Sequence, residues 1–102
     1  MTIDTDLHIW LETQWAPGET VLVPHLLSMR TVQMRFTIDL VRSGGNGASR
    51  IRQHGELGTV AGQAAVLSRL AVKGSDDARC RMEITLREGE RQVAVFHVDC
   101  LR

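Results

Sequence analysis

Apolar and polar residues alternate most regularly between residues 32 and 42 (VQMRFTIDLVR). The apolar positions are Val32, Met34, Phe36, Ile38 and Leu40. A period of two predicts a β-strand with one buried and one solvated face, because a helix would spread these side chains around its circumference. Residues 43–47 (SGGNG) have the composition of a turn. We therefore predict a hairpin in which residues 50–57 form the returning strand.

Four further segments have the pattern of strands. Residues 78–87 alternate between apolar and polar positions as residues 32–42 do, with Arg79, Arg81 and Arg87 on the outward side. In residues 6–15, every second residue from Leu7 to Trp15 lies on one side, and residues 91–100 follow a tight turn as the last strand. Residues 20–29 (TVLVPHLLSM) are apolar on both faces around Pro24. Because proline has no N–H to donate to a ladder, Pro24 predicts either an edge strand or a bulge at that point.

Residues 62–72 (GQAAVLSRLAV) fit two patterns. Val66, Leu67 and Leu70 have the spacing of a helical face, whereas Val66, Ser68, Leu70 and Val72 alternate as in a strand. The strand is favoured because every unambiguous neighbour is a strand, but the pattern leaves both alternatives open.

About seven short strands, separated by turn signals roughly every 8–12 residues, are typical of an Ig-like sandwich. We therefore predict an all-β fold, an Ig-like antiparallel β-sandwich of about seven strands. A length of 102 residues corresponds to a single domain over residues 1–102, with residues 1–5 expected to be a disordered N-terminus.

Composition removes several classes of partner. The chain has 12 basic and 12 acidic residues, so its net charge gives no reason to expect nucleic acid or an anionic membrane as the main partner. No apolar run approaches the ~20 residues that a membrane-spanning helix needs. The first residues have neither the basic start nor the apolar core of a secretory signal. The protein is therefore either cytoplasmic or an exported protein whose signal has been removed.

Catalytic and metal-binding patterns are not found. The four histidines fall on four different predicted strands without metal-ligand spacing. They are His8, His25, His54 and His97. The carboxylate pairs Asp76/Asp77 and Glu88/Glu90 lie in predicted loops, where solvated turns are the usual explanation. We expect no enzyme activity, no metal site and no cofactor.

Cys80 and Cys100 allow one disulfide at most. A three-residue loop at residues 88–90 would place Cys80 opposite Val98 and Cys100 one diagonal step away. Diagonal neighbours lie about 7 Å apart, whereas a disulfide requires Cα atoms about 5.5–6 Å apart. This register favours two half-buried thiols, although a bulge would bring the two cysteines close enough to form a disulfide.

Basic residues concentrate around the predicted central hairpin. We expect Arg35 and Thr37 on the solvated face of one strand to share a surface with Arg50 and Arg52 on the other. One interpretation is a solvated sheet face whose charges prevent edge-to-edge association. The other is a binding surface for an acidic or amide-rich partner.

Several segments together resemble the CsgC/CsgH-type curli-assembly inhibitors, most nearly the alphaproteobacterial CsgH branch. The resemblance is carried by the hairpin MRFTIDLVRSGGNGASRIRQHGEL, the segment AGQAAVLSRLAV, the loop DDAR and the final hairpin CRMEITLREGERQVAVFHV. It extends from about Leu7 to Val98. The CsgC branch has a Cys-x-Cys at the start of its central strand, but this chain has Val32, Gln33 and Met34 there, so no redox role is implied.

The resemblance implies an Ig-like sandwich without cofactor or catalysis. It further implies a periplasmic, signal-processed monomer that acts as a chaperone-like inhibitor of amyloid polymerisation by curlin-type subunits. The partner would bind transiently through a sheet face or edge, with Arg35, Thr37, Arg50 and Arg52 as the expected contact residues. The alternative is a structural or adhesive Ig-like accessory module of a fimbrial or cell-surface system, without inhibitory activity.

Overall fold

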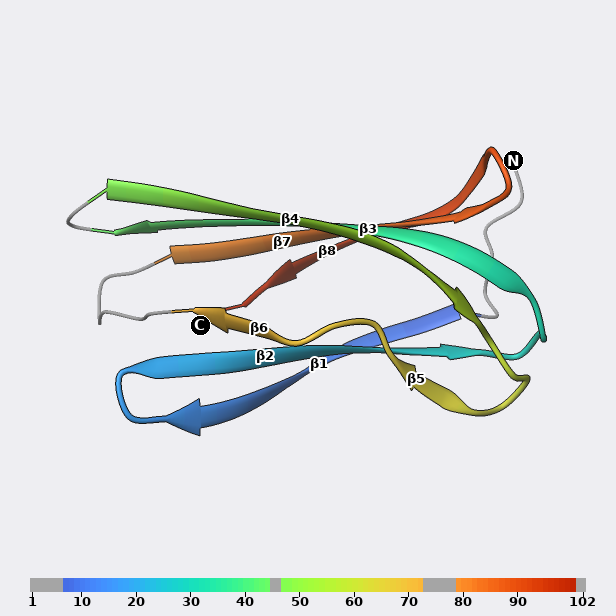
Figure 1. Cartoon of the computed structure of the whole chain (residues 1–102), viewed down its shortest axis with the longest axis horizontal. Coiled ribbons are helices and arrows are strands. Elements are labelled where there is room, and N and C mark those ends of the chain that lie inside the picture. Colours follow the sequence, from blue (N-terminus) through green and yellow to red (C-terminus); the bar gives the residue numbers. More distant parts are fainter. Residues whose placement is uncertain (1–6, 45–46, 73–78, 101–102) are drawn as a thin grey trace.

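The computed structural model describes residues 7–44, 47–72 and 79–100, and every regular element in these ranges is a β-strand. The strands form two antiparallel sheets that stack face to face (Figure 1). One sheet contains β1 (Leu7–Ala16), β2 (Glu19–Ser28), β5 (Ala64–Val66) and β6 (Leu70–Val72). The other has the order β4 (Gly47–Gly58), β3 (Gln33–Gly44), β7 (Arg79–Glu88) and β8 (Arg91–Asp99). The predicted all-β antiparallel sandwich is confirmed.

The structure has eight strands, one more than the roughly seven expected, because residues 62–72 form two short strands. Both β5 and β6 pair with β2, and residues 67–69 between them leave the ladder. The helical alternative for this segment is therefore excluded. The predicted loop at residues 73–77 and the N-terminal residues 1–5 lie outside the described residues, as do residues 45 and 46 of the predicted turn.

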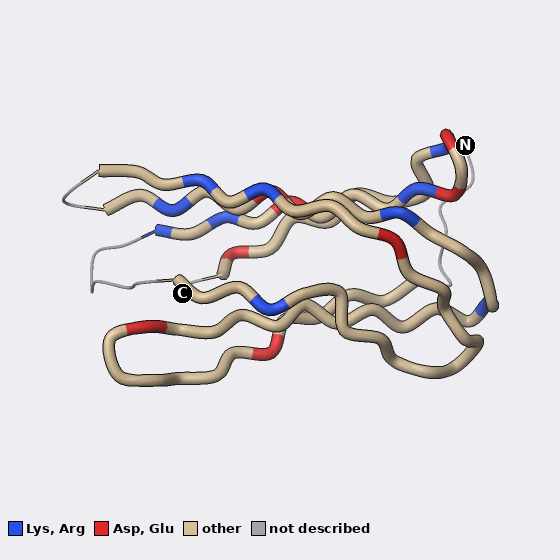
Figure 2. Tube along the Cα trace, viewed as in Figure 1, with Lys and Arg blue, Asp and Glu red and all other residues tan. Residues whose placement is uncertain are grey.

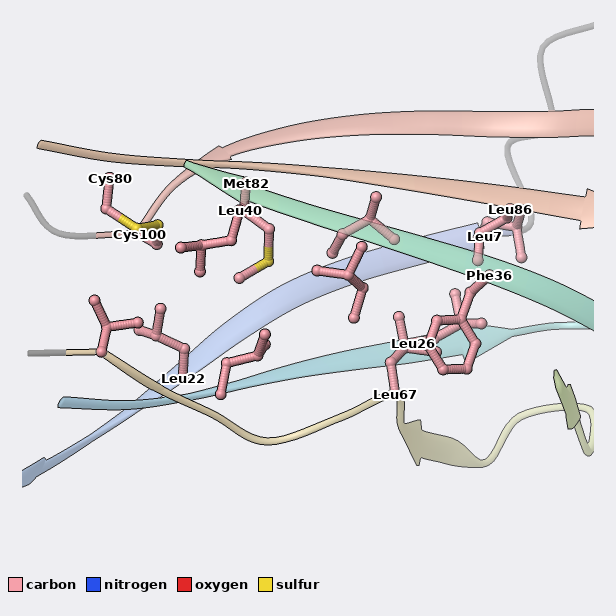
Figure 3. Close-up of a cluster of buried hydrophobic side chains, with 14 of the residues drawn as sticks. Leu7, Leu22, Leu26, Phe36, Leu40, Leu67, Cys80, Met82, Leu86 and Cys100 are labelled. Carbon is pink, nitrogen blue, oxygen red and sulfur yellow. A yellow bond between two sulfur atoms is a disulfide. The ribbon is translucent and has the colours of Figure 1, made fainter. Parts of the chain in front are cut away.

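The core lies between the sheets and is built from the inward positions that the alternation predicts. Side chains of β3 and β7 meet those of β2 across the sandwich (Figure 3). The fully buried residues include Leu22, Leu26, Ile38, Leu40, Ile84 and Leu86. Burying an aliphatic side chain of this size contributes roughly 1.5–3 kcal/mol, so this layer holds the two sheets together.

Pro24 lies in an internal strand, so the edge strand, one of the two predicted alternatives, is wrong, and the other, an irregularity of the ladder at this point, lies on the partner side. The N–H of Leu67 donates to the carbonyl of Pro24 at 2.9 Å, so the backbone polar groups of Pro24 face β5 and β6. The ladder on that side is interrupted between Val66 and Leu70. The missing N–H of proline therefore faces a break in the partner strand, and no ladder hydrogen bond is lost.

The register of β7 and β8 corrects the prediction for the cysteines. Glu88 pairs with Arg91, so the connecting turn has two residues and not three. A bulge at Val93 adds one more step, and Cys100 then lies opposite Cys80, with its N–H donating to the Cys80 carbonyl at 3.0 Å. The two residues form a disulfide with a Cα–Cα distance of 5.1 Å. The expectation of two free thiols was wrong because each irregularity shifts the register by one residue.

Gly55 lies where β4 passes over an aromatic ring of the core. It pairs with Phe36 of β3. A Cβ atom at Gly55 would lie 2.9 Å from Cζ and 3.0 Å from Cε1 of Phe36, closer than carbon atoms ordinarily approach. The absence of a side chain therefore lets the buried ring of Phe36 cover the backbone of β4.

We expect Gly55→Ala to lower the free energy of unfolding by about 1–3 kcal/mol, because the added methyl overpacks the Phe36 site. Urea denaturation of both proteins measures the difference. Gly58→Ala is the matched control, since its Cβ would meet only the Oε1 atom of the exposed Gln33 at 3.2 Å. That control should change stability by less than about 0.5 kcal/mol. Equal midpoints for the Gly55 and Gly58 variants would contradict the expectation.

Candidate functional site

The outward side chains of β4, β3 and β7 form a polar and charged surface, called the outer face below. Figure 2 shows that basic residues gather on this sheet more than on the other. All four residues predicted to bind a partner lie there and are exposed. They are Arg35 and Thr37 on β3, and Arg50 and Arg52 on β4. The structure therefore brings the predicted residues together on one surface.

Strand pairing arranges the outer face in rows across the sheet. Thr37 lies between His54 of β4 and Thr85 of β7. In the next row, Asp39 lies between Arg52 and Glu83. Directly opposite residues on one face of a sheet have Cβ atoms about 4.5–5.5 Å apart, so each row acts as a set of interacting side chains.

Asp39 binds two of the predicted arginines. Arg50 donates from Nε to Oδ1 at 2.9 Å and from Nη2 to Oδ2 at 2.6 Å, which is a bidentate pair. Arg52 donates from Nε to Oδ2 at 3.4 Å. The hydrogen bonds from Arg50, reinforced by the charges of Arg50 and Arg52, hold the pKa of Asp39 below its usual 3.8, and they outweigh the opposing effect of desolvation.

This pKa shift predicts a pH-dependent contribution to stability. A carboxylate whose pKa is lower in the folded state stabilises the fold at pH values above its unfolded pKa, and the contribution is lost as the pH falls through the folded pKa. We therefore expect Asp39→Asn to lower the urea midpoint at pH 7, with a difference that shrinks once the pH falls below about 4. Urea titrations at several pH values measure it.

The control for this experiment is Glu90→Gln, in the β7–β8 turn. Glu90 is exposed and has no ion pair within the described residues, so its variant should keep the wild-type midpoint at pH 7. A difference between wild type and Asp39→Asn that stays constant from pH 7 to pH 3 would contradict the proposed role of the carboxylate charge.

A second set of arginines on the outer face is not ion-paired. Arg35 donates from Nε to Glu56 at 3.1 Å, so all three predicted arginines bind carboxylates of the chain itself. Arg79, Arg81 and Arg87 of β7 are exposed and make no ion pair within the described part of the chain. Sequence reasoning placed them outward but did not include them in the site. The signal that identifies them is their alternate spacing on a strand beside β3.

The outer face has an excess of three positive charges, which the neutral net charge of the chain conceals. The basic residues are Arg35, Arg50, Arg52, Arg79, Arg81 and Arg87. The acidic residues are Asp39, Glu56 and Glu83. A shallow depression in this face is lined by Arg50 and Arg81 together with carboxylates of β3, β7 and β8. The surface can bind a polar, extended partner but does not enclose a small molecule.

Within residues 7–44, 47–72 and 79–100, no three metal-ligating side chains come together. None of the described elements is a helix long and apolar enough to cross a membrane.

Comparison with known proteins adds three findings. A family model described as thin aggregative fimbriae synthesis protein (Tafi-CsgC) matches residues 5–96. The solution structure of R. palustris CsgH is similar, with a TM-score of 0.74, 18% sequence identity and 91% of each chain covered. The structure of E. coli curli protein CsgC has a TM-score of 0.77 and 21% identity, covering 94% of this chain and 99% of that chain. Comparison with curated protein sequences gives no match.

Proposed function

Because this chain belongs to the family of thin aggregative fimbriae synthesis proteins, we propose that it keeps curli subunits from polymerising into amyloid before they are assembled. The family acts in the synthesis of these fimbriae, which are curli. In this proposal the protein is a chaperone-like inhibitor that works by transient binding, as a monomer, without catalysis or a cofactor. Its partners are curlin-type subunits.

The observation that carries the proposal is the excess of positive charge on the outer face, next to a row of hydroxyl groups. The unpaired guanidinium groups of Arg81 and Arg87 have several donors free for carboxylate or amide oxygens of a partner. Thr37 and Thr85 lie between these two arginines along the sheet. Arg35, Arg50 and Arg52 extend the same surface across β3 and β4. Ladders of Asn and Gln side chains add to the stability of amyloid, and arginine donors match the amide oxygens of such side chains.

The disulfide indicates the compartment. Disulfides persist in oxidising environments and are rare in the cytosol. The Cys80–Cys100 bond in a member of a curli accessory family therefore points to an extracytoplasmic compartment. We propose that this compartment is the periplasm, which secreted subunits cross before export.

The experiment that tests the proposal is a thioflavin T assay of the curli major subunit with this protein at substoichiometric concentration. We expect a longer lag phase, because an inhibitor that binds early oligomers transiently acts on many of them. The protein alone should give no thioflavin signal. An unchanged lag phase together with stoichiometric binding to fimbrial components would contradict inhibition and favour a structural or adhesive accessory module.

A further inference from the structure

The strand β1 is an edge that no other described element covers. It pairs with β2 on one side, and β2 is the only described element with which it makes extensive contact. Its register with β2 is continuous over all ten residues, from Leu7 opposite Ser28 to Ala16 opposite Glu19. A long, regular edge presents a row of unpaired backbone groups on which another strand can add.

Strand pairing shows which backbone groups are available on this edge. Leu11 lies opposite Pro24, whose polar backbone groups face away from β1. In an antiparallel ladder, such a pair exchanges no hydrogen bonds, so the N–H and C=O groups of Leu11 face the open edge. The same holds for every second residue, including Ile9 and Thr13. These residues offer the donors and acceptors that an added strand requires.

The other edges carry the features by which proteins prevent strand addition, whereas β1 lacks them. Arg50 and Arg52 project from β4, and a bulge interrupts β8. The strands β5 and β6 have only three residues each. Between Leu7 and Ala16 there is no lysine, arginine, proline or glycine, and Glu12 is the single acidic residue. By these criteria β1 is the edge open to pairing.

Both tryptophans of the chain are exposed on this strand. Trp15 is 76% exposed and Trp10 is 42% exposed, whereas Phe36 is buried and Phe96 is half-buried. The ring of Trp10 stacks on that of His25 with centroids 5.1 Å apart, and His25 is in turn hydrogen-bonded to Glu12 at 2.8 Å. Exposed tryptophans concentrated on one edge are typical of an interaction surface.

We propose that β1 binds an extended segment of the amyloid subunit by strand addition, with Trp10 and Trp15 contacting the side chains of the added strand. The identity of this partner rests on the proposed function. The single charge on β1 suits a segment with low net charge, and amyloid-forming segments combine low charge with high β-propensity. Pairing with β1 would occupy the backbone groups through which such a segment joins a growing fibre.

Amide hydrogen exchange of the ¹⁵N-labelled protein, with and without excess unlabelled monomeric curli major subunit, tests the proposal. We expect the subunit to slow exchange about tenfold or more at the edge-facing amides of Ile9, Leu11 and Thr13. The amide of Glu12 faces β2 and should change little. The indole N–H signals of both tryptophans should shift.

Two proline variants sharpen the test. Thr13→Pro removes an edge-facing N–H at an exposed position without removing a hydrogen bond to β2, and proline is tolerated at such a position. It should abolish the slowing and raise the half-inhibitory concentration about tenfold, the equivalent of ~1.4 kcal/mol. Val95→Pro, whose N–H faces the open edge of β8 and whose side chain is not part of the outer face, should stay within about twofold of wild type. If Thr13→Pro fails to fold, Thr13→Lys places a charge on the same edge and should have the same effect.

The outcomes separate this proposal from the proposed function. If wild type lengthens the lag phase but its β1 amides are unaffected, inhibition stands and strand addition is wrong. If the subunit slows hydrogen exchange of the β1 amides but wild type does not change the lag phase, strand addition stands and inhibition is wrong. If exchange of these amides is already slowed in the protein alone, and slows further as its concentration rises, then a second copy of this chain pairs with β1. That result would overturn the proposal.

Discussion

Replacing Cys80 and Cys100 together by alanine is expected to lower the free energy of unfolding by about 3 kcal/mol. The disulfide closes a loop over a sequence separation of 20 residues. In the chain-entropy description, a loop of this length removes about that much conformational freedom from the unfolded state. For a domain of about 100 residues, the loss corresponds to a fall in Tm on the order of 10–20 °C.

The position of the disulfide supports a large effect. Cys80 lies in the second position of β7, and Cys100 directly follows β8, so the bond ties the end of the last strand to the sheet. Both residues are buried and belong to the core cluster. Without the bond, the end of β8 would be held to the sheet only by backbone hydrogen bonds and by the packing of Val98 against the core, and would fray more readily.

Urea denaturation with and without a thiol reductant measures this contribution. The reductant should destabilise wild type about as much as the double substitution does, and should leave the double variant unchanged. A single Cys80→Ala variant provides a further control for the lost side-chain packing. Identical midpoints for oxidised wild type and the double variant would show that the disulfide does not contribute to stability.

Replacing Arg79, Arg81 and Arg87 by glutamine is expected to raise the half-inhibitory concentration in the thioflavin assay about tenfold. These side chains make no ion pair within the described residues, so their charge is available to a partner. An exposed ionic contact contributes about 0.2–1 kcal/mol, and three such contacts together approach the ~1.4 kcal/mol of a tenfold change.

The matched control replaces Arg35, Arg50 and Arg52, the three arginines predicted from the sequence. They must release Glu56 or Asp39 before binding another carboxylate, so their loss should raise the half-inhibitory concentration less than about threefold. Both triple variants should keep the far-ultraviolet spectrum of wild type. If the control variant loses more potency than the first triple variant, the ion-paired arginines form the contact. If both triple variants inhibit as well as wild type, the outer face is excluded as the binding surface.

Alternation predicted the strands and their inward residues well where one face is dry and the other wet. Residues 32–42 and 78–87 were assigned correctly because their buried apolar positions alternate, and Val41 is the one apolar residue of β3 that lies on the solvated face. The β7–β8 register was not predictable in the same way. Val93 and Ala94 are both apolar and both pack against the core, so no polar residue marks the bulge between them.

The candidate site was predictable as a surface but not as an electrostatic arrangement. Alternation alone places Arg35 and Thr37 outward, and a hairpin brings β4 alongside. Which carboxylate meets which arginine depends on the β3–β4 register, which pairs Asp39 with Arg52 and leaves Arg50 on the diagonal. The unpaired arginines of β7 could be assigned to the same surface only once the structure showed that β7 lies directly beside β3.

The bulge at Val93 also bears on how this hairpin varies in evolution. Val93 is the residue that has no direct partner on β7, because Gln92 pairs with Arg87 and Ala94 with Leu86. A relative lacking this one residue would have a regular hairpin and would still place its cysteines opposite each other, with one residue fewer between them. In an alignment with such a relative, the gap belongs at Val93 and not in the turn. The spacing of the two cysteines then reveals, from sequence alone, whether a homologue has the bulge.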